Sequence, residues 1–251
     1  MCFDIDSSPP IAPISGAAVS HDELVLEARD GNRSAAFAAT PDESSRVGVV
    51  VLPDVRGLYR FYEELALRFA ERGYAAIAFD YYGRTAGVSK RGDEFEYMPH
   101  VERTTQEGIQ TDVASAVEHL RATGSTSVFT VGFCFGGRNS WLAAASGHGL
   151  AGAVGFYGRP GSGRDGSPGP TARAAEFAAP ILALQGGDDP GIPLEEVDAF
   201  DKALDAAGVE HEVVVYPGAP HSFFDRKHKE FAADSEDAWN RVLAFLERYE
   251  A

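Results

Sequence analysis

Short runs of apolar residues recur along the chain, and longer amphipathic segments separate them. Val47–Leu52 is apolar throughout, and residues 74–79 and 180–185 are nearly so. Such runs are typical of strands that are buried on both faces of a parallel sheet. Residues 61–72 and 107–121 instead place apolar side chains at helical spacing among charged ones. The alternation predicts an α/β fold, with a mostly parallel sheet covered by helices on both faces.

The N-terminal part of the chain has a different pattern. Residues 23–29 and 33–39 flank Asp30-Gly31-Asn32, which predicts an antiparallel hairpin at one edge of the sheet. Residues 1–20 are rich in Pro, Ser and Ala without periodicity, so we expect a loosely ordered arm before a single domain over residues 21–251. The same reading predicts further strands at 127–130, 150–157 and 211–216, helices at 139–145, 194–207 and 231–249, and a Gly/Pro/Ser-rich excursion at 158–170.

Composition narrows the classes of function. The 251-residue chain carries a net charge of −16, which disfavours a broad basic surface for nucleic acid or anionic lipid. It has no apolar run of membrane-spanning length, and its first residues do not form a secretory signal. Only Cys2 and Cys134 could form disulfides, so we expect a cytoplasmic protein that acts on a small molecule as a monomer or homodimer.

Gly132-Phe133-Cys134-Phe135-Gly136-Gly137 stands between a predicted strand and a predicted helix. Gly-x-Cys-x-Gly-Gly is a nucleophile elbow with cysteine in place of serine, so Cys134 is the candidate nucleophile and Cys2 is expected to have no function. The backbone amide of Phe135 would then face the oxygen of an attacked carbonyl at the helix N-terminus. The alternative is that Cys134 is simply a small buried side chain in a glycine-rich bend.

An acid and a base follow the elbow in the order that α/β-hydrolases use. Asp188 and Asp189 follow the predicted strand at 180–185, and His221 follows the last predicted strand. We prefer Asp189 as the acid, although the two aspartates could simply form an Asx turn. The other histidines lie in tails, helices or strand starts and are expected to be surface or packing residues. No cluster has metal-ligand spacing, so neither a metal nor a cofactor is expected.

Together these segments resemble the dienelactone hydrolase family of α/β-hydrolases. The resemblance covers most of the chain after the arm and is carried by residues 52–55, 79–84, 132–137, 153–158, 186–193 and 218–223. It implies an α/β-hydrolase fold and a Cys134-His221-Asp189 triad that hydrolyses an enol-lactone or related ester through an acyl-enzyme. It also implies an oxyanion hole made by the amides of Val55 and Phe135. Asp54 stands where the family places a glutamate that pairs with the resting cysteine.

Substrate recognition is the part in which this chain departs from the family. Arg84 lies in a matching motif beside Tyr82, where it could bind a substrate carboxylate or only tie its own loop to the sheet. Arg91 is the nearest counterpart of a second anchor, Phe223 follows His221 closely, and Asp225 replaces an expected arginine. We predict substrate contacts from Arg84, Tyr82, Arg91 and Phe223. The alternative to an enzyme is a non-catalytic or regulatory protein of this fold that binds a small molecule.

Overall fold

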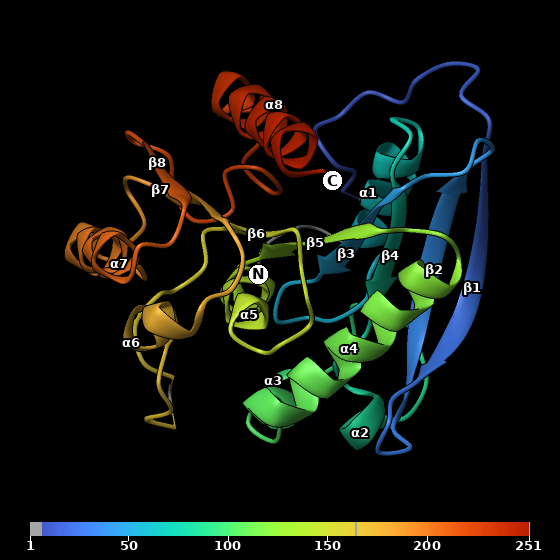
Figure 1. Ribbon diagram of the computed structural model, residues 1–251, viewed down its shortest axis with the longest axis horizontal. Helices are drawn as coiled ribbons and strands as arrows, with labels where there is room; N and C mark the ends of the chain where they lie inside the picture. The colour runs from blue at the N-terminus through green and yellow to red at the C-terminus, as the bar shows by residue number, and fades with distance from the viewer. Residues whose placement is uncertain (1–6, 164, 251) are drawn as a thin grey trace.

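The computed structural model describes residues 7–163 and 165–250, so the expectation for Cys2 lies outside the described residues. An eight-stranded sheet runs through the molecule in the order β1-β2-β4-β3-β5-β6-β7-β8 (Figure 1). Its strands are β1 (Val19–Glu27), β2 (Arg33–Pro41), β3 (Val47–Leu52), β4 (Ala75–Phe79), β5 (Ser127–Phe133), β6 (Gly152–Phe156), β7 (Ile181–Gly186) and β8 (His211–Tyr216).

Strands β3 to β8 pair with one another in a parallel sense, whereas β1 and β2 form the predicted antiparallel hairpin. Strand β2 joins the hairpin to β4, also in an antiparallel sense. At the hairpin turn, Gly31 has φ 82°, and the Ala28 amide donates to the Asn32 carbonyl over 2.8 Å. This mixed, mostly parallel sheet confirms the predicted fold class.

Helices cover both faces of the sheet (Figure 1). Side chains of α1 and α8 pack on one face, and those of α4, α5 and α7 pack on the other. The predicted long helices are present, and four short helical segments were not predicted. The bounds are α1 (Arg60–Ala70), α2 (Gly83–Ala86), α3 (Met98–Val101), α4 (Gln106–Ala122), α5 (Phe135–Ala144), α6 (Pro170–Arg173), the 3₁₀ helix η1 (Ala174–Glu176), α7 (Leu194–Ala207) and α8 (Ala232–Tyr249).

The all-apolar sequence of β3 follows from this two-sided cover. Val49 and Val51 belong to the core on the α1 and α8 face, whereas Val50 and Leu52 belong to the core on the α4 face. Successive strand residues point to opposite faces, so a strand between two helical layers needs apolar residues at every position. The sheet is therefore held from both sides where β3 and β5 bring their C-terminal ends together.

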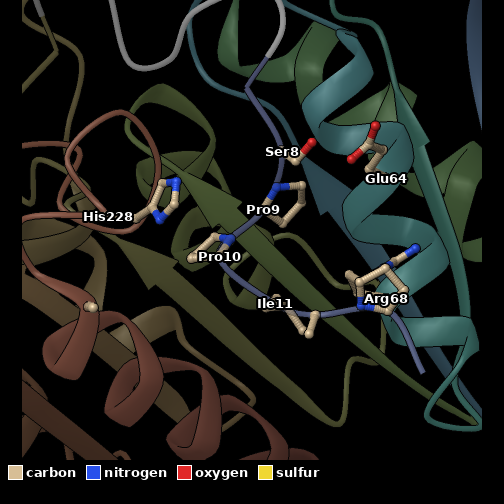
Figure 2. Close-up of a pocket in the computed structure, with 10 residues that line it drawn as sticks. Ser8, Pro9, Pro10, Ile11, Glu64, Arg68 and His228 are labelled. Atoms are coloured by element: carbon tan, nitrogen blue, oxygen red, sulfur yellow. The ribbon is translucent and has the colours of Figure 1, made fainter. Parts of the chain in front are cut away.

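Residues 8–14 of the N-terminal arm lie against helix α1, whereas the last two residues of the predicted arm belong to β1. Ile11 is buried, and the Ile14 amide donates to Oε2 of Glu71 over 3.0 Å. A cavity of about 480 Å³ lies beneath this segment. Figure 2 shows Pro9 and Pro10 between His228 on one side and Glu64 and Arg68 on the other. The residues that line this cavity include none of the predicted catalytic residues.

Across the described ranges, none of the helices combines the length and the apolar character needed to cross a membrane.

Candidate active site

Cys134 lies between β5 and α5 with φ 56° and ψ −112°. A non-glycine residue rarely adopts positive φ, and such strain is concentrated at functional sites. The Cys134 amide donates to the Phe156 carbonyl over 3.0 Å, which ties the turn to the end of β6. The backbone thus presents the thiol at the start of a helix, next to the C-terminal ends of the parallel strands.

The glycines of the elbow are required by close backbone contacts. A Cβ on Gly132 would lie 2.1 Å from the Gly136 carbonyl oxygen. One on Gly136 would lie 2.1 Å from the Leu52 carbonyl oxygen, and one on Gly137 would lie 2.6 Å from that of Phe156. Real Cβ atoms essentially never come this near a backbone oxygen. The three glycines therefore let the elbow approach both β3 and β6.

Asp189 and His221 are directly hydrogen-bonded. Nδ1 of His221 lies 2.6 Å from Oδ2 of Asp189, whose other oxygen accepts from the Gly191 amide over 2.8 Å. The Asp189 side chain is 2% exposed and that of His221 is 32% exposed. A carboxylate accepts, so Nδ1 carries a proton, and in the neutral imidazole the lone pair is then on Nε2. The neighbouring Asp188 instead uses its amide to bind the Ala219 carbonyl.

Tyr157 connects the cysteine and histidine segments. It directly follows Phe156, whose carbonyl holds the Cys134 amide, and its ring centroid lies 4.9 Å from that of His221. Tyr157 has φ 36°, a conformation that turns the chain sharply at the end of β6. The structure thus brings the segments that carry Cys134 and His221 to the same strand end.

Residues 54–57 form a tightly held turn beside the elbow. The Gly57 amide donates to the Asp54 carbonyl over 3.1 Å, and the Arg56 amide donates to Oδ1 of Asp54 over 2.8 Å. The Tyr82 hydroxyl donates to the Val55 carbonyl. Because the Asp54 carbonyl points into the turn, the amide of the same peptide unit, that of Val55, points away from it. The Phe135 amide is the first of α5 and has no acceptor within the helix.

Asp54 is completely buried and lies within electrostatic reach of other site residues. Burial raises the pKa of Asp225 well above its usual range, and the negative charge of Asp54 raises that pKa further. Burial likewise raises the pKa of Tyr81 well above its usual range, with contributions from Asp54 and Cys134. Asp54 directly follows Pro53, whose carbonyl oxygen would lie 2.3 Å from a Cβ on Gly136, so its turn adjoins the elbow.

The structure gives the four predicted substrate-binding residues other contacts. Tyr82 and Phe223 are completely buried, and Nη2 of Arg91 lies 2.7 Å from Oδ2 of buried Asp80. Arg84 binds Asp30 in the hairpin turn and Asp112 in α4. Substrate contact by these residues stays a prediction, and in this geometry it is not supported. Arg84 instead has the loop-tying role that the sequence left open.

One group of polar side chains lies outside the predicted site. His211 at the start of β8 lies 3.2 Å from Oδ1 of Asp201 and 3.9 Å from Oδ1 of Asp205 in α7. His211 was expected to be a surface or packing residue because it stands at a strand start. Its carboxylate neighbours come from a separate element, so no local pattern indicated them. These carboxylates are about half or more exposed, and the arrangement is that of a surface His–Asp cluster.

The fold and the elbow define the class of protein first: this is an α/β-hydrolase. The profile of the Dienelactone hydrolase family then matches residues 34–250, and the chain belongs to that family. A "Putative carboxymethylenebutenolidase" of Escherichia coli (strain K12) is 32% identical over 87% of this chain and 84% of the relative. A "Probable 2-oxo-3-(5-oxofuran-2-ylidene)propanoate lactonase" of Bradyrhizobium sp is 30% identical over 86% and 90%.

A solved structure shows the same relationship. The crystal structure of a "Putative Dienelactone Hydrolase" from Klebsiella pneumoniae superposes with a TM-score of 0.80. It is 27% identical, and the match covers 92% of this chain and 100% of that chain. Family, relatives and fold agree, so the protein is a hydrolase of the lactone and ester type, as its sequence predicted.

Proposed function

We propose that this protein hydrolyses a small lactone or carboxylic ester through a Cys134-His221-Asp189 triad. The proposal depends mainly on the 2.6 Å hydrogen bond between His221 Nδ1 and buried Asp189. Cys134 lies in a strained turn at the same strand end. A carboxylate that fixes the tautomer of a histidine beside a nucleophile is the arrangement that covalent hydrolysis needs.

Acylation begins with proton transfer from Cys134 Sγ to His221 Nε2. The thiolate attacks the substrate carbonyl, and the amides of Val55 and Phe135 stabilise the oxygen anion that forms. As the tetrahedral intermediate collapses, the alcohol oxygen leaves and takes the proton from His221. With a lactone, this step opens the ring, and the leaving hydroxyl stays attached to the acyl group on Cys134.

Deacylation returns the enzyme to its starting state. His221 takes a proton from a water molecule, and the hydroxide attacks the thioester carbonyl. The carbon–sulfur bond breaks, the carboxylic acid product leaves, and Cys134 regains its proton from His221. No redox change occurs, so the reaction needs only a reduced thiol, and Cys134 is a free cysteine. A reducing cytoplasm, the predicted location, would preserve it.

Asp54 is proposed to act on the resting cysteine. It is completely buried, and its side chain accepts from the Arg56 amide in the same turn that carries the Val55 amide. A carboxylate near the thiol would accept a hydrogen bond from it in the resting state and help its deprotonation when His221 takes the proton. Aspartate is one methylene shorter than the family's glutamate, so this role requires the 54–57 turn to lie close to the elbow. The proximity of Gly136 to the Pro53 carbonyl, 2.3 Å from where a Cβ would lie, supports it.

Replacing the nucleophile tests the proposal. We expect Cys134→Ala to abolish hydrolysis of chromogenic esters and enol-lactones while the circular dichroism spectrum stays unchanged. Cys134→Ser should retain weak esterase activity, because the same histidine can activate a hydroxyl. Cys2→Ala is the matched control and should behave like the wild type. An active Cys134→Ala protein would refute the mechanism, and iodoacetamide that fails to label Cys134 selectively would favour a non-catalytic binding protein.

A further inference from the structure

A buried tyrosine and a buried aspartate meet behind the histidine. Tyr157 at the end of β6 donates its hydroxyl proton to Oδ2 of Asp225 over 2.7 Å. Asp225 is 1% exposed and lies in the same loop as His221, and its other oxygen accepts from the Arg226 amide. The Tyr157 amide donates to the Leu184 carbonyl over 2.7 Å. Tyr157 is therefore fixed at both its backbone and its hydroxyl.

The Tyr157 ring packs against the His221 imidazole, whereas Asp189 binds the imidazole at Nδ1. The plane of the Tyr157 ring is tilted 56° from the imidazole plane at a centroid distance of 4.9 Å. A hydrogen bond from Nδ1 to Asp189 fixes one edge of the imidazole, and the Tyr157 ring packed against the imidazole limits how far it can turn. This restraint matters because small misplacements of a catalytic group cost much rate.

We propose that Tyr157 and Asp225 form a buried pair that positions the His221 imidazole for proton transfer with Cys134. The inference rests on the proposed hydrolytic function and adds two positioning residues to it. The Tyr157 ring limits the motion of the imidazole. Asp225 fixes the Tyr157 hydroxyl and connects it to the backbone of the His221 loop. Neither side chain needs to contact the substrate.

A carboxyl suits this position because its two oxygens accept from opposite sides. Oδ2 accepts from the Tyr157 hydroxyl on β6, and Oδ1 accepts from the Arg226 amide in the His221 loop. An asparagine offers one accepting oxygen and would turn its NH₂ group toward one of the two donors. Burial raises the pKa of Asp225, whereas these two hydrogen bonds and the nearby His221 lower it. Asp225 can make both contacts only because an ionisable carboxyl group is buried there, which costs free energy.

The test removes the hydrogen bond between Tyr157 and Asp225 and keeps an aromatic ring at position 157. In Tyr157→Phe the ring stays but the bond to Asp225 is lost, so we expect kcat to fall about tenfold while KM stays within about twofold. The pH dependence of Cys134 alkylation by iodoacetamide should move toward that of an ordinary thiol, because His221 would pair less well with the thiolate. In an Asp225→Ala background, Tyr157→Phe should lower kcat by less than about a further twofold, because the hydrogen bond between the two residues is already absent.

Tyr216→Phe is the matched control. Tyr216 is also buried and also donates to a carboxylate, Oδ2 of Asp237 at 2.9 Å, but its bond joins β8 to α8. The Tyr216→Phe substitution should leave both kcat and the pH profile of Cys134 alkylation unchanged.

The proposal is overturned if folded Tyr157→Phe keeps the wild-type kcat and alkylation profile, or if the losses from Tyr157→Phe and Asp225→Ala are additive. Should Tyr157→Phe not fold, Asp225→Asn is judged by the same two measurements, and if neither folds, the pair is only a core contact and the proposal is wrong. Activity in Cys134→Ala would instead refute the proposed function itself, so the two failures are distinguishable.

Discussion

Cys134 adopts a backbone conformation that its own side chain disfavours, and the surrounding groups maintain it. Its amide is bound by Phe156, and the adjacent glycines allow contacts that any Cβ would block. His221 is likewise restrained by Asp189 at its edge and by Tyr157 at its face. At the residue scale, the site therefore consists of two reactive groups whose positions are determined by their neighbours.

Asp189→Asn should be far more damaging than Asp188→Asn. The introduced asparagine could present an NH₂ group to Nδ1 of His221, which would select the wrong tautomer. In the serine protease precedent the same change lowers kcat by about 10⁴. Asp188 makes its described contact through its amide, which the substitution retains. Steady-state kinetics on one chromogenic ester compares the two, and a larger loss in Asp188→Asn would move the acid by one residue.

Elements that are far apart in sequence are joined around the site by polar contacts. Tyr82 and Asp80, which follow β4, hold the turn after β3 through the Val55 carbonyl and the Leu58 amide. Arg84 joins the β1–β2 turn to α4 through Asp30 and Asp112. The hairpin is thereby coupled to the segment that holds the 54–57 turn.

Arg84→Ala should destabilise the fold without selecting among substrates. Asp112 has a side chain only 1% exposed, so removing its partner leaves a nearly buried carboxylate, and we expect a loss of about 3 kcal/mol in urea unfolding. Adding Asp112→Asn should recover part of that loss. Lys202→Ala, which breaks an exposed pair with Asp198, should cost under about 1 kcal/mol. A selective loss on acidic esters, with neutral esters unaffected, would restore Arg84 as a substrate anchor.

Taken as a whole, the molecule shows what its sequence could and could not predict. The buried strands were visible because two-sided burial demands continuous apolar runs, and the elbow was visible because its glycines are required by close contacts. Residues 80–105 have no steady period, so α2 and α3 were missed. The contact of Tyr157 with Asp225 spans 68 positions and leaves no local pattern, although Tyr157 ends one predicted strand and Asp225 lies in the loop after another. The partners of Arg84 are also distant in sequence, so they could not be predicted from a local pattern either.

The stability of the whole molecule should fall in acid partly through His148. Burial lowers its pKa to about 4, with Arg121 and Arg29 adding to the effect, and its Nε2 lies 3.0 Å from Oε1 of Gln110. The folded pKa lies below the ordinary value of 6.5, so the unfolded chain binds more protons between these values. Stability is thus retained above pH 6.5 and is lost as the pH falls toward about 4.

His148→Gln should remove this loss, which is at most about 3 kcal/mol and is reduced by partial solvent exposure. Urea unfolding of the variant and the wild type at several pH values isolates the effect, because other titrating groups contribute equally to both proteins. His21→Gln, at an exposed position in β1, is the control. If the difference between variant and wild type did not change with pH, His148 would be excluded as the source.

The central claim is that the reaction passes through a covalent acyl group on Cys134. Rapid quenching of the enzyme with a slowly hydrolysed chromogenic ester, followed by intact and peptide mass spectrometry, measures this directly. We expect a burst of chromophore approaching one equivalent per chain, a mass increase equal to the acyl group, and its location on the peptide that contains Cys134. Turnover at the normal rate with no acyl group on that peptide, or with the acyl group on another residue, would contradict the account.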